Sequence, residues 1–356
     1  MGPFVKKCIK KAKLVVLWFR RILFAPNHFK EVGFFTKLRM NVSGGYLADQ
    51  YALYDFKHND KNQYLSEFDW YRSRWINEPF DQMCNNKIIC TNVLDRYVAC
   101  PKLLLMKNHG NMVSLEYDHA DGFRTTADVV SLLDQYGQLF MKPLAAGKGK
   151  GVRRLDKVGD SLFIDTKEVT FSQLDAFLNK EDNWFLSEGM KQSAFEDGLY
   201  DQTTNTIRFI TLRDPKSGNF KVFFAVQRIG TSGTIPVDNG SRGGLVAKID
   251  LETGTLSAAH TLQHHGWHKV HPDSGAQIEG AVIPNWADLK EKMLDLARRF
   301  PFMNFIAWDI LLCDNEQGFC IVEANTSSGV NIIQLFGPQR YGELGDFYRA
   351  HNVLKK

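Results

Sequence analysis

Residues 305–329, with the sequence FIAWDILLCDNEQGFCIVEANTSSG, constrain the fold of this chain more than any other segment. Two apolar runs flank the polar stretch DNEQG, which predicts a β-hairpin. Three polar side chains stand within the otherwise apolar arms: Asp309, Glu323 and Asn325. A buried sheet does not ordinarily accept such groups without partners, so the hairpin should carry a site as well as a core.

The length of the turn decides how these side chains are arranged. If the five residues DNEQG form the turn, Cys313 pairs with Phe319, and Asp309 then lies directly opposite Glu323. Asn325 shares their face, because strand side chains alternate. A turn of four residues would instead place Asp309 opposite Val322, on the wrong face. The prediction therefore depends on this register.

Two carboxylates directly opposite each other repel, and a cation between them removes the repulsion. Carboxylate and amide oxygens are hard ligands that suit Mg²⁺ or Mn²⁺, and Mg²⁺ usually keeps positions for water and phosphate oxygens. Asp309, Glu323 and Asn325 are therefore predicted to hold a metal ion shared with a phosphate-bearing ligand. The alternative is three polar residues on a solvated face.

A glycine-rich stretch, FMKPLAAGKGKGV at 140–152, begins as a strand and continues as a loop. Backbone N–H groups of such a loop can turn toward phosphate oxygens. Lys142 and either Lys148 or Lys150 would add positive charge, although the stretch lacks the ending of a P-loop. The glycines in question are Gly147, Gly149 and Gly151. The stretch equally suits a plain surface turn.

Charge is distributed unevenly along the 356 residues, whose formal net charge is +4. Residues 1–40 contain ten Lys or Arg and one Glu, a net charge of +9, which leaves −5 for the remainder. A nucleic-acid partner is therefore not expected. Six cysteines without a C-x-x-C pair favour reduced thiols and a cytoplasmic location.

The N-terminal arm has the pattern of an amphipathic helix. Apolar residues recur with helical spacing at Val5, Ile9, Ala12, Val16, Phe19 and Leu23, next to several lysines and arginines. This pattern suits peripheral contact of residues 4–24 with an anionic membrane, at its inner face for a cytoplasmic protein. The alternative is a helix that docks on its own domain with solvated lysines. The apolar run is far shorter than the roughly 20 residues needed to span a bilayer.

The rest of the chain predicts an α+β fold with antiparallel sheets rather than a regular βαβ array. We expect four regions: the basic arm at 1–40, a helical region at 41–105, one α+β subdomain at 106–190 and a second at 191–356. Arg208 lies in a predicted strand of the second subdomain and should be partly buried beside an anionic partner.

Several segments resemble, in order, the ATP-grasp superfamily, and most closely its sugar-transfer-associated branch. The segments are NNKIICTNVLDRYVACP, LFMKP, AAGKGKGV, WFLSEGMKQ, and the pair WDILL and IVEAN. The branch is indicated by NTIRFITL, RIGTSGTIPVDNGSRGGLVAKID and HPDSGAQIEG. The resemblance covers roughly residues 85–340 and implies two α+β subdomains that hold ATP between antiparallel sheets.

The resemblance also implies roles for individual residues. Lys87 and Lys142 would bind phosphates, Glu188 and Met190 would lie at the adenine hinge, and Arg208 would stabilise the transferring phosphoryl group. The ribose-binding acid of the family has no clear counterpart, and Gln192 and Glu196 are the alternatives. Asn239, Arg242 and His271 are candidates for contact with substrate.

The chemistry implied by the resemblance is ATP- and Mg²⁺-dependent joining of a small-molecule carboxylate to an amine or a sugar-linked acceptor through an acyl phosphate. The name of the branch suggests surface polysaccharide or sugar-conjugate synthesis. A sugar or small-molecule kinase on the same scaffold is one alternative, and a non-catalytic nucleotide- or glycan-binding protein is another.

Overall fold

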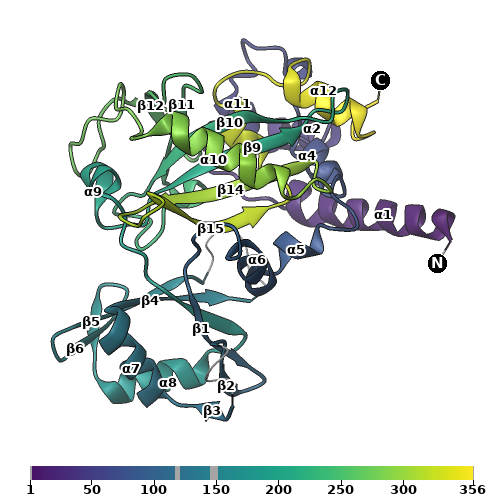
Figure 1. Cartoon of the computed structure of the whole chain (residues 1–356). Helices are drawn as coiled ribbons and strands as arrows, with labels where there is room; N and C mark the ends of the chain where they lie inside the picture. Colours follow the sequence, from purple (N-terminus) through teal and green to yellow (C-terminus); the bar gives the residue numbers. More distant parts are fainter. Residues whose placement is uncertain (1, 117–120, 145–150, 356) are drawn as a thin grey trace.

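The strands of the chain form two antiparallel sheets, one in each lobe of the computed structural model shown in Figure 1. The structure describes residues 2–116, 121–144 and 151–355. The expected α+β architecture with antiparallel sheets is confirmed. Figure 1 places the two sheets one above the other, with the chain passing between them near β1 and β4.

The smaller lobe contains a sheet of eight strands in the order β3-β2-β1-β8-β4-β5-β6-β7. Helices α7 (Thr126–Tyr136) and α8 (Phe171–Lys180) cover one face of this sheet and share a core with it. Both helices begin with a capping box, which satisfies N–H groups that the first helical turn leaves free. The strands are β1 (Leu103–Asn108), β2 (Asn111–Ser114), β3 (Phe123–Arg124), β4 (Gln138–Pro143), β5 (Arg153–Val158), β6 (Ser161–Ile164), β7 (Lys167–Val169) and β8 (Trp184–Glu188).

The larger lobe contains a sheet of seven strands in the order β13-β12-β11-β10-β9-β14-β15. Helix α10 (Trp286–Arg298) packs its apolar side on one face, as its helical spacing predicts. Helices α11 (Val330–Gln334) and α12 (Glu343–Ala350) cover the other face, and α9 (Ala194–Tyr200) lies near the edge (Figure 1). The strands are β9 (Thr206–Arg213), β10 (Phe220–Ile229), β11 (Leu245–Ile249), β12 (Leu256–Thr261), β13 (Trp267–His268), β14 (Phe305–Leu312) and β15 (Phe319–Asn325), with a short 3₁₀ helix, η4 (Gly240–Arg242), before β11.

The hairpin of β14 and β15 differs from its predicted form near the turn. Leu312, not Cys313, is the partner of Phe319, so the predicted five-residue turn is wrong. Pairing shifts by one residue between Asp309 and Ile310, where β15 carries one residue more than β14. Such a β-bulge is common beside functional sites, because it re-aims side chains.

The bulge restores the predicted pairing beyond it. Asp309 lies opposite Glu323, and Ala307 lies opposite Asn325, as expected. The extra residue is Val322, which follows the pair Ile310–Ile321 on β15. The prediction that Asp309 and Glu323 meet across the hairpin is therefore confirmed, although the bulge rather than the turn produces it.

The residues before β1 form helices that pack mainly on the larger lobe. Leu65 belongs to the core beneath α11 and α12, and Asn77 donates a hydrogen bond to the carbonyl of Phe305 at 2.7 Å. Gln334 accepts a hydrogen bond from the backbone N–H of Leu65 at 2.7 Å. The helices are α1 (Pro3–Trp18), η1 (Phe19–Leu23), α2 (Phe34–Val42), α3 (Ala48–Leu53), η2 (Lys61–Gln63), α4 (Glu67–Ser73), α5 (Gln82–Asn85) and α6 (Lys87–Leu94).

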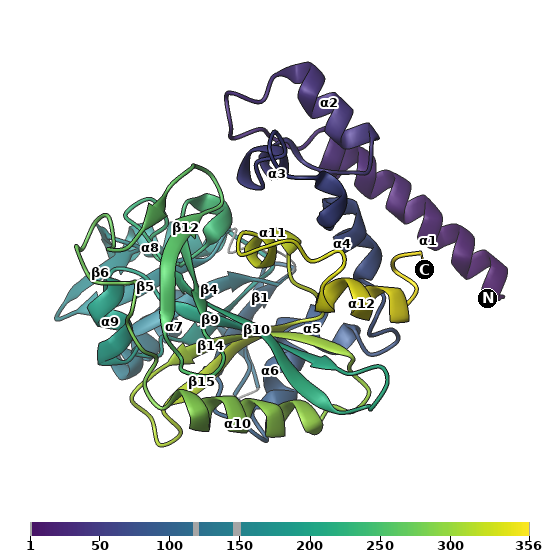
Figure 2. The same cartoon turned by 90° about the horizontal axis from the view of Figure 1, so that it is seen from above.

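Helix α1 projects from the larger lobe, as Figures 1 and 2 show. Its end is anchored: Ile22 in η1 is fully buried, and the indole of Trp18 donates a hydrogen bond to the carbonyl of Asn41 at 3.3 Å. Within the described ranges, no helix is both long and apolar enough to span a bilayer.

Candidate active site

A cavity of about 610 Å³ is lined by residues of both sheets and of the N-terminal helices. It contains most of the residues that the sequence singled out. Those that line it are Lys87, Lys142, Glu188, Met190, Arg208, Asn239, Asp309, Glu323 and Asn325. The fold gathers these residues from seven separate segments: α6, β4, β8 with the residues that follow it, β9, the loop after β10, β14 and β15.

A row of charged side chains crosses the larger sheet beneath this cavity. Arg208 on β9 is the register partner of Asp309 on β14, which in turn is the partner of Glu323 on β15. The guanidinium of Arg208 contacts both oxygens of Asp309, with Nε to Oδ1 at 2.6 Å and Nη2 to Oδ2 at 3.1 Å. Its Nη1 donates to the hydroxyl of Ser328 at 3.4 Å. The expected anionic partner of Arg208 is therefore Asp309.

Arg228, which the sequence analysis missed, extends the row onto β10. It lies opposite Thr206 and donates from Nε to the Thr206 hydroxyl at 3.1 Å. Its Nη2 lies 3.3 Å from Asp238 and 3.4 Å from Asp309. Burial would lower the pKa of Arg228, but these two carboxylates raise it above its usual value. The signal was present in the sequence: an arginine in the apolar run VFFAVQRIG, opposite Thr206 once the hairpin is paired.

Asp309 is almost completely buried, yet its carboxyl is held ionised. Burial raises its pKa, but Arg208 and Arg228 lower it by a larger amount, and the net shift is downward. Asp238 behaves differently, since burial outweighs the attraction of Arg228 and raises its pKa. The centre of the row is therefore a fixed negative charge between two arginines.

Lys87 and Lys142 add positive charge near Glu323, at the β15 end of the row. Lys87 begins α6, which is capped by the side chain of Asn86, and its Nζ lies 2.5 Å from Oε1 of Glu323. Lys142 projects from β4, and burial, followed by the charge of Lys87, lowers its pKa to about 8. Two cations in such proximity favour an anion between them.

The predicted metal ligands fit a Mg²⁺ ion in chemistry. Glu323 and Asn325 alternate onto one face of β15 and line the cavity with Asp309. The amide nitrogen of Asn325 is buried and has no hydrogen-bond partner within the described part of the chain, and a half-turn of the amide presents its oxygen instead. Among the described residues, no group of three or more His, Cys, Asp and Glu side chains is arranged so that it could hold a metal ion, so the candidate set depends on the amide of Asn325. Two carboxylates and an amide leave positions for phosphate oxygens and water.

The predicted hinge residues also line the cavity. Glu188 ends β8 and Met190 follows it, and burial raises the pKa of Glu188. Ser187, opposite Phe140, also lines the cavity, and its hydroxyl is buried without a partner among the described residues.

Neither alternative for the ribose-binding residue lines this cavity. Both functional groups of the Gln192 amide are used: it donates to Asp197 at 2.9 Å and accepts from the backbone of Asn205 at 3.0 Å. Glu196 is fully buried and accepts a hydrogen bond from Gln227 at 2.8 Å. Both side chains stabilise the packing of α9 instead.

Part of the predicted glycine-rich loop lies outside the described residues, namely Gly147, Lys148 and Gly149. Gly151 is described and has φ of +79°, a conformation that side chains with a Cβ rarely adopt. A Cβ there would also lie 3.0 Å from Pro143 at the end of β4. The chain therefore needs glycine where the loop rejoins the sheet.

The structure separates the three candidates for substrate contact. Asn239 lines the cavity, whereas Arg242 is exposed and does not line it. His271 is buried: its Nε2 lies 2.7 Å from the carbonyl of Gly230, and its ring stacks on Tyr200. Its Nδ1 accepts backbone N–H groups of the following turn at 3.2 and 3.1 Å. His271 thus fixes a loop and does not line the cavity.

Comparison with solved structures finds several ATP-grasp enzymes of low sequence identity. A structure of the ATP-grasp ligase PsnB, complexed with a phosphomimetic variant of minimal precursor, Mg and ADP, is 12% identical with a TM-score of 0.41, over 78% of this chain and 62% of that chain. D-alanyl-alanine synthetase A from Vibrio cholerae is 13% identical with a TM-score of 0.44, over 76% of this chain and 65% of that chain. This chain therefore matches less than two thirds of the length of either enzyme. No curated protein matches it.

A family model described as sugar-transfer associated ATP-grasp matches residues 71–341. This range is well over half of the chain and includes both sheets and every residue of the charged row. The two-sheet architecture around the cavity is accordingly an ATP-grasp fold, as the sequence resemblance implied. The chain belongs to the sugar-transfer associated ATP-grasp family.

Proposed function

We propose that this protein is an ATP- and Mg²⁺-dependent ligase that joins a carboxylate to an amine. One observation carries the proposal: Arg208, Asp309 and Glu323 form a charged row across three neighbouring strands, and two lysines approach it in the same cavity. Phosphoryl transfer requires positioning and neutralisation of oxygens more than covalent help from the protein, and this set of side chains supplies both.

The charges of the cavity match a nucleotide bound with a divalent metal. Arg208, Arg228, Lys87 and Lys142 supply positive charge toward phosphate oxygens. In a site that excludes water, such charges stabilise a developing negative charge more strongly than they would in solution. A Mg²⁺ held by Asp309, Glu323 and Asn325 would supply Lewis-acid polarisation of the phosphate. Arg208, which is fixed by Asp309, would then orient the transferring phosphoryl group.

The proposed reaction has two steps. A substrate carboxylate oxygen attacks the γ-phosphorus of ATP. The bond between the γ-phosphorus and the β,γ-bridging oxygen breaks, which gives an acyl phosphate and ADP. An amine nitrogen then attacks the acyl carbon, and phosphate leaves as the nitrogen loses a proton. The roles of Lys87 and Lys142 are to hold ATP phosphates as point charges. Glu188 and Met190 would receive the adenine ring, and Asn239 would contact the substrate.

The setting of the reaction is part of the same proposal. The substrates would be a small-molecule carboxylate and an amine or sugar-linked acceptor, in the synthesis of a surface polysaccharide or sugar conjugate. The support for this setting is the family description, which associates the family with sugar transfer. We place the protein in the cytoplasm, with residues 4–24 in peripheral contact with the inner face of an anionic membrane. The support is that this stretch contains seven Lys or Arg and no Asp or Glu, and leaves several apolar side chains exposed.

The test is release of ADP and phosphate, measured over a matrix of amino acids, other small carboxylates and amino sugars. A ligase releases phosphate only when an acid and an amine are present together, and the product contains a new amide. A stable phosphorylated product with no amine requirement would instead identify a kinase. If the protein binds nucleotide but turns over no combination in the matrix, the ligase assignment is wrong. If Glu323→Gln binds Mg-ATP with the same affinity as the native protein, the metal assignment is wrong.

A further inference from the structure

Helix α1 has two apolar sides, and only one of them packs on the protein. Leu14, Leu17 and Trp18 are partly covered, and Ile22 beyond them is fully buried. The side predicted from the sequence faces solvent: Val5 is 46% exposed, Ile9 38%, Val16 52% and Phe19 48%. The helix therefore docks on its own fold with one side and leaves an apolar surface open on the other.

Helix α2 carries a second exposed apolar surface, outside residues 4–24. Phe34, Phe35, Leu38 and Val42 have helical spacing and are exposed by 71%, 83%, 37% and 67%, while Met40 on the other side is buried. Helix α2 lies against η1, the segment that continues α1, so the two helices belong to one part of the molecule (Figure 2). Exposed apolar residues grouped on one side of a helix indicate an interaction site rather than ordinary surface.

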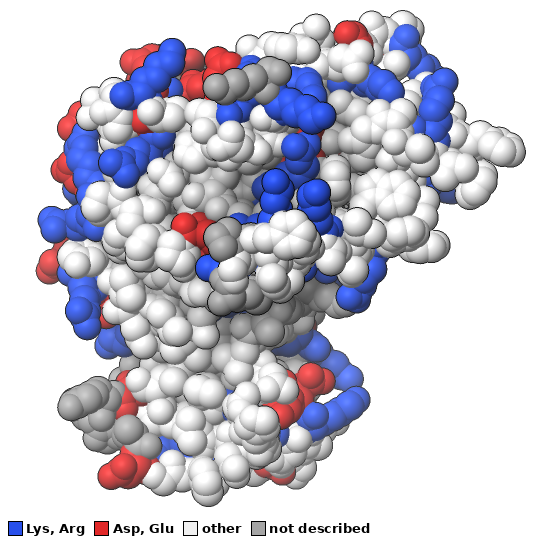
Figure 3. Space-filling view, turned by 90° about the vertical axis from the view of Figure 1, so that its right-hand side faces the viewer, with Lys and Arg blue, Asp and Glu red and all other residues white. Residues whose placement is uncertain are grey.

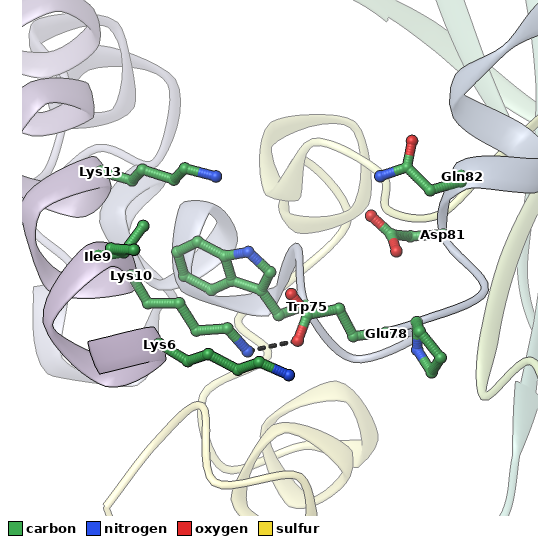
Figure 4. A pocket seen from close by; sticks show the side chains of 9 residues that line it. Lys6, Ile9, Lys10, Lys13, Trp75, Glu78, Asp81 and Gln82 are labelled. Atoms are coloured by element: carbon green, nitrogen blue, oxygen red, sulfur yellow. Dashed lines mark hydrogen bonds and ion pairs between the residues drawn. The ribbon is translucent and has the colours of Figure 1, made fainter. Parts of the chain in front are cut away.

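Basic side chains border the open surface. Lys6, Lys10 and Lys13 line a groove of about 640 Å³ between α1 and residues 75–82 (Figure 4). In Figure 4, Lys10 forms an ion pair with Glu78, in which Nζ lies 2.5 Å from Oε2. Figure 3 looks at the side from which α1 projects and shows lysine and arginine side chains next to an uncharged area. Long basic side chains can bury their stems beside apolar residues and keep their charges among lipid headgroups.

We propose that α1 and α2 together form one docking surface for an anionic lipid bilayer. The inference rests on the membrane contact proposed above for residues 4–24 and is independent of the ligase chemistry. It adds α2 as a second contact and thereby fixes the orientation of the protein, which a single helix leaves free to rotate about its axis. Charge complementarity favours a bilayer over a second copy of this chain, since two copies would bring the same lysines together.

The docking surface is continuous with the candidate active site. The segment that joins the two helices contributes Arg20, Arg21, Phe24, Pro26 and His28 to the lining of the 610 Å³ cavity. In the docked orientation, these side chains bring one end of the cavity close to the headgroups. An acceptor anchored in the same bilayer would reach the cavity without leaving the membrane.

The cysteines of the chain allow a direct test. Cys8 on α1 is exposed and the other five cysteines are buried, so an environment-sensitive fluorophore can be attached to Cys8 in the native protein. A second probe is placed on α2 by Phe35→Cys in a Cys8→Ser background. Val158→Cys in the same background is the matched control, because Val158 is 69% exposed on β5 in the smaller lobe.

With vesicles of phosphatidylglycerol and phosphatidylcholine, the probes at 8 and 35 should shift to the blue and be quenched by nitroxide-labelled lipid. The probe at 158 should do neither. A response at 8 without one at 35 would overturn the two-helix surface and leave the contact of α1 intact. No response at either position would overturn both. Light scattering without vesicles identifies self-association, which is the competing explanation and would also contradict the proposal.

Sedimentation with the same vesicles tests the energetic contribution of each helix. Phe34→Ser with Phe35→Ser, and separately Val16→Ser with Phe19→Ser, should each weaken binding by about tenfold or more, since each removes apolar side chains from the interface. Val158→Ser should have no effect. Vesicles of phosphatidylcholine alone should bind weakly, because the basic residues then find no anionic partner. Equal binding by the Phe34/Phe35 variant and the native protein would contradict the role of α2, and urea unfolding of each variant, measured in parallel, shows whether the fold is intact.

Discussion

Arg208 and Asp309 are register partners on neighbouring strands, and the guanidinium of Arg208 holds both oxygens of the Asp309 carboxylate, at 2.6 and 3.1 Å. Both side chains are largely buried. Desolvation makes a buried ion pair an expensive way to stabilise a sheet, since apolar side chains of similar volume often do so equally well. Its place at the floor of the cavity is better explained by orientation of Arg208 toward a ligand.

Replacement of Arg208 should reduce both activity and stability. Arg208→Lys keeps the charge but loses the planar fork, so we expect turnover to fall by about a hundredfold with a modest loss of stability. Arg208→Ala leaves a buried carboxylate without its main partner and should lower the free energy of unfolding by about 3 kcal/mol or more. ADP release and urea unfolding measure these effects. The control is Arg298→Ala, which removes an exposed pair with Asp295 and should change neither.

Glu323 should determine the dependence on Mg²⁺. Glu323→Gln removes one negative oxygen from the proposed ligand set and frees Lys87, whose Nζ lies 2.5 Å from that carboxylate. The Mg²⁺ concentration for half-maximal turnover should rise about tenfold or more, as expected when a metal loses a charged ligand. The control is Glu316→Gln, an exposed change in the turn of the same hairpin. An unchanged Mg²⁺ requirement in Glu323→Gln would remove Glu323 from the metal site.

Nucleotide affinity should decrease as the pH rises through about 8, the value to which burial and Lys87 lower the pKa of Lys142. Bound phosphate favours the charged form of Lys142 and raises its pKa. Above pH 8, the free protein has lost this proton from Lys142, so nucleotide binding must be accompanied by its uptake. Affinity is therefore highest below this pH and falls above it. Titration calorimetry with ADP and Mg²⁺ between pH 7 and 9.5 tests the effect. Lys142→Met should bind more weakly at neutral pH and show a flatter profile, and a native profile that is already flat would contradict the assignment.

The buried carboxyl of Glu196 should make the free energy of unfolding depend on pH, independently of catalysis. Burial raises the pKa of this carboxyl well above 4.5, so the folded state holds its proton more tightly than the unfolded state. Its contribution to stability is fully present below pH 4.5 and is lost as the pH rises through the folded pKa. Glu196→Gln should therefore stabilise the protein at pH 7, measured by urea unfolding, with little effect at pH 4. Glu291→Gln on the exposed side of α10 serves as the control.

The sequence predicted those features that depend on neighbours along the chain. The hairpin of β14 and β15, the helix α10 and the amphipathic arm follow from strand alternation and helical spacing, which are local properties of the backbone. The pairing of Asp309 with Glu323 was also predicted, but from a turn that does not form. A bulge at Val322 compensates for the different turn, and its position depends on packing that the hairpin sequence does not specify.

Only the tertiary structure decided which polar residues meet. Arg228 and Asp238 joined the charged row because β10 pairs with β9 and the following loop folds back on it, whereas Gln192 and His271 were turned into the packing of α9 and the loops. The exposed side of α2 likewise depends on where that helix docks. Periodicity indicates which side chains share a face of a helix or strand. Whether that face meets a cavity, a core or solvent depends on contacts between separate elements, and no local pattern encodes these contacts.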